Sequence, residues 1–183
     1  MKTLIMYYSL SGNTEALAKK KARELDADIE RIVEINPPSM IVGIHRAVNR
    51  TRATIQPIQL QPDDYDKIII MSPVWAGHPV SAIYTVIDLL PTGKQVELIM
   101  TSRGGSTQRS VLGTKALVTD RGCEIVGYSD VVVKIDKLTG EVSATPVKPM
   151  NLSYLVTIGV AIGTVLLAAV GIYKLAKKIK GSL

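Results

Sequence analysis

The sequence predicts an α/β domain with a parallel sheet covered on both faces, followed by one transmembrane helix. Through residues 1–134, short apolar runs alternate with segments of helical periodicity, the order expected when helices cross over between parallel strands. Further along, the segment from Tyr154 to Tyr173 has no charged side chain and is long enough to cross the hydrocarbon core of a bilayer.

The first half of the domain is predicted to run strand, helix, strand, helix. Residues 2–8 form a continuous apolar run, as in a strand buried on both faces. Residues 14–25 place leucines and alanines on one helical stripe and charged side chains outside it. Residues 28–35 alternate apolar and polar side chains until two prolines end the strand. A serine then precedes residues 40–50, which have an apolar helical face, and residues 51–66 are expected to be irregular.

The second half repeats the alternation. Residues 67–72 (KIIIMS) are a third, buried strand, and residues 80–90 are expected to be helical. A fourth strand is predicted over residues 95–101, a helix over 106–121 and a fifth strand over 124–133. The domain is therefore expected to contain a five-stranded parallel sheet.

Composition excludes several classes of protein. The formal net charge is +6, but Lys174, Lys177, Lys178 and Lys180 lie at the C-terminus and the rest of the chain is close to neutral, so we expect no nucleic-acid partner. Cys123 is the only cysteine, which excludes an internal disulfide and a cysteine-based metal cluster. The sequence indicates no metal site and no catalytic acid or base.

The segment SLSGNT, residues 9–14, joins the first strand to the first helix. In open α/β sheets, ligands bind at the carboxyl ends of the strands, where a following helix presents unpaired N–H groups and its positive dipole end. Hydroxyl and amide side chains add donors, and Gly12 lets the backbone approach a ligand closely. Because the loop has no lysine, it favours a phosphate monoester held without a metal. An ordinary serine- and asparagine-rich helix cap is the alternative.

Three loops resemble those of the flavodoxin family. SLSGNT matches the family's phosphate loop, [ST]-x-[ST]-G-x-[ST]; SPVWAGHP, residues 72–79, resembles the second flavin loop of the short flavodoxin-like proteins; and TSRGGST, residues 101–107, resembles the third. All three follow predicted strands, and the resemblance covers about residues 1–134. It implies a three-layer sandwich with strand order 2-1-3-4-5 and FMN at its top edge. The residues that it assigns to FMN are Ser9, Leu10, Ser11, Gly12, Asn13, Thr14, Pro73, Val74, Trp75, Ala76, Gly77, Thr101, Ser102, Arg103, Gly104 and Gly105.

Individual residues of these loops leave alternatives open. Trp75, the only tryptophan, is expected in a turn, where its ring could stack on a flat ligand or fill the sheet edge. His78 could touch flavin or cap the next helix. Arg103 would stabilise the anionic reduced form of a nearby flavin. The basic positions His45, Arg46, Arg50 and Arg52 indicate either a solvated face or a docking surface for anionic lipid head groups or an acidic partner.

Beyond the domain, the sequence predicts a linker over residues 135–150, a transmembrane helix over 151–174 and a basic tail over 175–183. Tyrosines bracket the apolar span as interfacial aromatics do, and burial against a partner subunit is the alternative. Gly159 and Gly163 form a GxxxG pattern, which allows either a homodimer or a foreign membrane subunit. The N-terminus lacks the pattern of a signal peptide, so the flavin domain is expected on the cytoplasmic side of the cell membrane.

The function that follows is a single-pass membrane flavoprotein. It would use FMN to pass electrons to a membrane-associated acceptor, either a quinone or a redox protein. One alternative is an FMN-dependent oxidoreductase with a small-molecule acceptor, similar to quinone reductases or to flavodoxin-like protoporphyrinogen oxidases. Another is a flavin-free subunit of a membrane complex that kept the fold.

Overall fold

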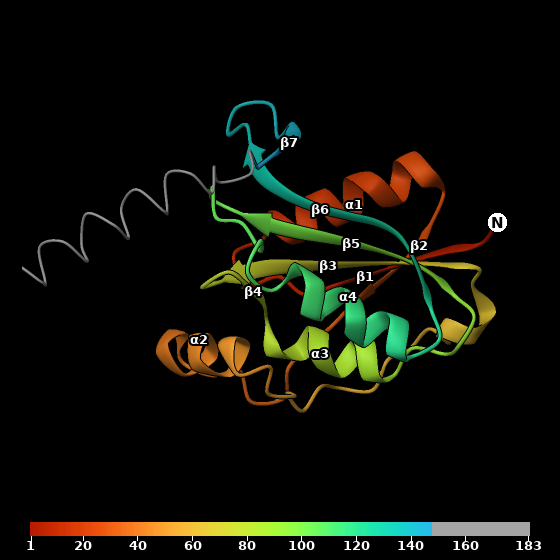
Figure 1. Ribbon diagram of the computed structural model, residues 1–183. Coiled ribbons are helices and arrows are strands. Elements are labelled where there is room, and N and C mark those ends of the chain that lie inside the picture. Colours follow the sequence, from red (N-terminus) through yellow and green to blue (C-terminus); the bar gives the residue numbers. More distant parts are fainter. Residues whose placement is uncertain (148–183) are drawn as a thin grey trace, which may run out of the picture. The chain divides into compact units, whose positions relative to one another are not determined.

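The structure, a computed structural model, describes residues 1–147, which form one sheet with helices on both faces (Figure 1). Helix α1 lies on one face, and α3 and α4 lie on the other. The elements are β1 (Thr3–Tyr7), α1 (Asn13–Leu25), β2 (Asp28–Arg31), α2 (Met40–Val48), the 3-10 helix η1 (Pro62–Asp64), β3 (Lys67–Trp75), β4 (His78–Pro79), α3 (Ser81–Asp88), β5 (Gln95–Ser102), α4 (Val111–Asp120), β6 (Glu124–Ile135) and β7 (Val142–Pro146).

The predicted order of the five parallel strands is confirmed. The sheet runs β2-β1-β3-β5-β6, and each neighbouring pair in that series is parallel. This order places the carboxyl ends of β1, β3 and β5 side by side. The loops that follow these strands therefore meet at one edge of the sheet.

The expectation of a purely parallel, five-stranded sheet is wrong. The two-residue strand β4 pairs antiparallel with β3, and β7 pairs antiparallel with β6. Strand β7 lies within residues 135–150, which the sequence indicated as a linker. The backbone N–H groups of Leu138 and Thr139 donate to the Asp136 carboxylate over 2.8 and 2.9 Å, and Gly140 has a φ of 70°. These contacts close a β6–β7 hairpin.

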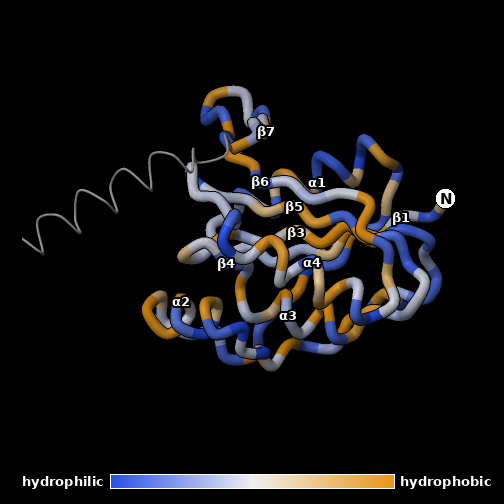
Figure 2. Tube along the Cα trace, in the orientation of Figure 1, coloured by the Kyte–Doolittle hydropathy of each residue, from blue (hydrophilic) through white to orange (hydrophobic). Residues whose placement is uncertain are grey.

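Two apolar cores explain why the strands read as continuous apolar runs. Successive residues of β1, such as Leu4 and Ile5, are fully buried on opposite faces of the sheet, and those of β3 behave alike. Figure 2 shows this apolar colour along the strands at the middle of the sheet. Phenylalanine is absent, and tyrosines supply the large aromatic volume: Tyr7, Tyr8, Tyr65 and Tyr84 are all buried.

Within residues 1–147, no helix is both long enough and apolar enough to cross a bilayer. The predicted transmembrane helix over 151–174, its Gly159 and Gly163, and the basic tail over 175–183 lie outside the described residues.

Candidate functional site

The first loop turns from β1 into α1 and presents a set of free backbone donors. Gly12 adopts a φ of 85°, and α1 begins at Asn13 without a side-chain cap. No hydrogen bond within residues 1–147 uses the backbone N–H groups of residues 10–14. Since these donors lie at the positive end of the helix dipole, they can bind an anion such as a phosphate.

Ser9 supports the same interpretation. Ser9 as a whole is 7% exposed, and its buried hydroxyl has no hydrogen-bond partner among the described residues. A buried polar atom without a partner is costly, so a ligand atom would satisfy a group that the protein leaves free. This orphaned hydroxyl and the unpaired N–H groups fit the phosphate group that the sequence predicts for the loop.

Thr14 ties the first loop to the third. Its Oγ1 lies 2.7 Å from Oγ1 of Thr101, and Thr101 Oγ1 also donates to the carbonyl of Ser72 over 3.3 Å. Both threonines are almost fully buried. A short chain of hydrogen bonds therefore links all three loops.

The second loop is a tight hairpin between β3 and β4. Trp75 is the last residue of β3 and pairs with His78, which corrects the expectation that it lies in a turn. The two residues between them, Ala76 and Gly77, both have positive φ, 48° and 81°, as in a two-residue type I′ turn. Ser110 donates from its hydroxyl to the Gly77 carbonyl over 2.7 Å, which joins this hairpin to the third loop.

The third loop is longer than predicted, because α4 begins at Val111 and not at residue 106. The Ser102 hydroxyl donates to the Gly105 carbonyl over 2.6 Å and accepts from the Gly104 N–H over 3.1 Å. At the other end of the loop, the Thr107 N–H and hydroxyl both donate to the Asp130 carboxylate of β6, over 3.1 and 2.6 Å. These bonds leave Arg103 exposed at the tip of the loop.

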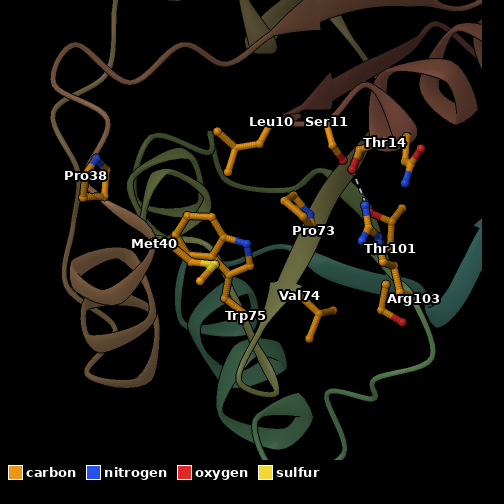
Figure 3. A pocket seen from close by; sticks show the side chains of 12 residues that line it. Leu10, Ser11, Thr14, Pro38, Met40, Pro73, Val74, Trp75, Thr101 and Arg103 are labelled. Carbon is orange, nitrogen blue, oxygen red and sulfur yellow. Dashed lines mark hydrogen bonds between the residues drawn. The ribbon is translucent and has the colours of Figure 1, made fainter.

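The three loops surround one hollow of about 630 Å³, within the size range of small-molecule sites (Figure 3). Its lining contains Leu10, Ser11, Asn13, Thr14, Pro73, Val74, Trp75, Thr101, Ser102 and Arg103 from the predicted set, together with Pro38 and Met40. The other predicted residues, Ser9, Gly12, Ala76, Gly77, Gly104 and Gly105, belong to the same loops but do not line the hollow.

Pro38 and Met40 are the lining residues that sequence reasoning missed. They precede and begin α2, which is far from the three loops in sequence. Figure 3 shows Met40 beside Trp75, across the hollow from Arg103. The sequence offered one sign of their role, which is that the first turn of α2 is apolar. Nothing in the sequence indicates what covers that turn.

The lining of the hollow carries little charge. Arg103 is the only charged side chain among the described residues that line it. His78 does not line it, and burial, followed by the nearby Arg50 charge, lowers the pKa of its imidazole. The predicted basic face is partly neutralised, since Arg46 pairs with Glu34 at 3.3 Å and Arg52 with Asp88 at 2.7 Å. The site thus combines an end with unpaired N–H groups, an apolar wall and one cation.

Comparison with known proteins points to flavoproteins. No family model matches the chain. Over 93 residues it is 31% identical to an NAD(P)H dehydrogenase (quinone) of Brucella anthropi, and the match covers 48% of this chain and 46% of that relative. The chain thus spans about half the length of this curated relative.

The similarity to solved structures covers a larger share of this chain. A Lactobacillus acidophilus flavoprotein in complex with FMN is 25% identical, with a TM-score of 0.60 over 70% of this chain and 92% of that one. A protein of known crystal structure from Bacteroides eggerthii is 24% identical, with a TM-score of 0.62 over 70% of this chain and 87% of that one. With the strand order and the loops at the carboxyl edge, these likenesses establish that the described residues have the flavodoxin-like flavoprotein fold.

Proposed function

We propose that this chain binds FMN in the hollow and acts as a membrane-anchored electron-transfer protein. The observation that carries the proposal is the arrangement of the three loops around one hollow, with free N–H groups at one end and an aromatic ring on the wall. FMN has one phosphate and one flat ring system, which such a site can hold. The FMN-bound Lactobacillus acidophilus relative supports the same cofactor.

Each end of the site would then have its own task. The N–H groups of residues 10–14 and the hydroxyls of Ser9 and Ser11 would bind the phosphate. The ring would lie beside Trp75, with its edges toward the backbone of the second and third loops. Bound FMN supplies reversible electron transfer, and the Arg103 charge would favour the reduced, anionic form. No side chain is needed as an acid or base in electron transfer itself.

Membrane attachment rests on the sequence of residues 151–174, which contains the charge-free span. Such a helix would tether the flavin domain to the cytoplasmic face and confine it to a thin layer beside its acceptor, a quinone or a redox protein. Gly159 and Gly163 would bring this helix against a second copy or against a helix of a membrane complex.

A second candidate is an FMN-dependent oxidoreductase with a small quinone as its acceptor. Apolar side chains at the mouth of the hollow favour it: Leu10 is 58% exposed and Met40 is 70% exposed. A flat, apolar acceptor could rest against these side chains, whereas an acidic rim would suit docking to a basic protein partner. The partial likeness to an NAD(P)H dehydrogenase (quinone) adds support.

The test is the purified full chain in mild detergent. It should be yellow, release FMN on denaturation, and rebind FMN after the flavin is removed. Ser11→Ala should weaken rebinding, while Leu138→Ala, at an exposed position of the β6–β7 hairpin, should not. Finding FAD, or no binding of added FMN, would contradict the proposal and favour a flavin-free subunit. Turnover of a small quinone with NAD(P)H would favour the second candidate.

The anchor needs a separate test, because FMN binding does not depend on it. The full chain should stay with membranes after alkaline carbonate washing. A chain ending at Pro149 should be released into the soluble fraction and remain yellow. A full chain that is released by carbonate would contradict the anchor but not the flavin site.

A further inference from the structure

Helix α2 contacts the Trp75 ring through a glycine. A Cβ atom built on Gly43 would lie 1.9 Å from Cζ3 of Trp75, and 2.8 Å from both Cε3 and Cη2. Contacts this short do not occur between real side chains and rings, so the Trp75 ring occupies the space that any side chain at position 43 would need.

The backbone of α2 does not itself require a glycine there. Gly43 lies inside the helix, its N–H donates to the Ser39 carbonyl over 2.8 Å, and it is not among the glycines with positive φ. Glycine within a helix is less stable than alanine, because it loses more conformational freedom on folding. The advantage of a glycine at this position therefore has to come from packing.

The same segment builds one wall of the hollow. Pro38 and Met40 line it directly, and Gly43 lies behind Trp75, which also lines it. The two buried residues of α2 are Gly43 and Ala47, so the helix approaches its neighbours through its smallest side chains. Figure 3 shows the Trp75 ring between the α2 segment and the centre of the hollow.

We propose that Gly43 is a positioning residue that sets the placement of the Trp75 ring and so the width of the flavin site. A methyl group at position 43 has two ways to be accommodated: the ring moves toward the hollow, or α2 moves outward and takes Met40 with it. Either movement changes the wall against which a flat ligand rests. The flavin part of this inference depends on the proposed function, but the contact between Gly43 and Trp75 does not.

The experiment is a double-mutant cycle in the full chain, with Gly43→Ala, Trp75→Ala and both together. Gly43→Ala should weaken FMN binding by about tenfold or more, the effect expected of overpacking, whereas in the Trp75→Ala background it should change FMN binding by less than about twofold. Gly113→Ala is the matched control. Gly113 is also inside a helix, and its Cβ would lie 2.2 Å from Nη2 of Arg50, but it does not line the hollow.

A flavin-free readout accompanies the binding assay. In apoprotein, Gly43→Ala should shift the emission of Trp75, the only tryptophan, and lower the melting temperature, while Gly113→Ala should leave the emission unchanged. In the Trp75→Ala background, Gly43→Ala should instead raise the melting temperature, since alanine is then the better helix former.

The outcomes separate the two proposals. Equal effects of Gly43→Ala on melting in both backgrounds, loss of folding in both backgrounds, or unchanged Trp75 emission would overturn the role of Gly43. If wild-type protein binds no FMN although the melting cycle shows coupling, the proposed function and the flavin part fail, and the packing contact stands. If FMN binds equally to wild type and to Gly43→Ala, the positioning role fails and the proposed function stands.

Discussion

The hydrogen bond between Thr14 and Thr101 allows a quantitative test of how the loops support one another. The two Oγ1 atoms are 2.7 Å apart, and the residues are 2% and 4% exposed. Valine has nearly the shape of threonine, so Thr14→Val removes this bond with little change in packing. Thr101 keeps the Ser72 carbonyl at 3.3 Å, so no donor is orphaned, and we expect a loss of about 1 kcal/mol in the free energy of unfolding.

The same substitution at Thr101, the other partner in this hydrogen bond, should lower the free energy of unfolding by more. Thr101→Val removes the bonds to both Thr14 and Ser72 and leaves the buried Thr14 hydroxyl without its partner, so we expect a loss of about 2 kcal/mol. Urea unfolding of the apoprotein measures both losses, and each kcal/mol corresponds to about 2–4 °C in melting temperature for a domain of this size. The double variant should lose less than the sum of the single losses. Strict additivity, or equal losses for the two single variants, would refute this account of the loop contact.

Three further predictions concern single residues. Ser9→Ala should not lower the free energy of unfolding of the apoprotein, because its hydroxyl has no described partner, yet it should weaken FMN binding about tenfold in a titration; a stability loss above about 0.5 kcal/mol would contradict this. Arg103→Ala should lower the reduction potential of bound FMN by about 40 mV in spectroelectrochemistry, with Arg103→Lys close to wild type; equal potentials in all three would refute it. Burial, followed by the hydrogen bond that the hydroxyl donates to Asp28 over 2.8 Å, raises the pKa of Tyr65 to about 12. Because the folded state holds this proton more tightly than the unfolded state, the stabilisation is complete below about pH 10 and is lost as pH rises through about 12. Tyr65→Phe should therefore flatten the decline of the urea midpoint between pH 10 and 12, and an identical decline would contradict the assignment.

The order of the parallel strands and the position of the first loop could be predicted from the sequence, because both depend on local patterns. Strands such as KIIIMS are buried on both faces, so their apolar character is continuous and easily recognised. The first loop is likewise defined by one glycine and its neighbouring donors, all within residues 9–14.

The rest depended on contacts between distant segments. Met40 reaches the hollow, and Gly43 meets Trp75, only because α2 packs beside β3 and β4, and neither relation leaves a local pattern. Strand β7 is short and mostly exposed, and its pairing is set by a turn around the Asp136 side chain, so composition alone indicated a linker. Helix α4 begins at Val111, later than predicted, because Asp130 of β6 holds Thr107 in the preceding loop.

The β6–β7 hairpin also affects how copies of this domain can meet. Without β7, the long strand β6 would expose a row of unpaired backbone groups, the kind of edge on which a second chain can add a strand. With β7 in place, Val131–Ile135 of β6 are paired, and the outer strand there ends in Pro146, which has no N–H to donate. The opposite edge is the short strand β2, where Asp28 and Arg31 are charged. At these two places the sheet resists growth by strand addition, which limits the length of backbone through which a domain with such apolar central strands could aggregate.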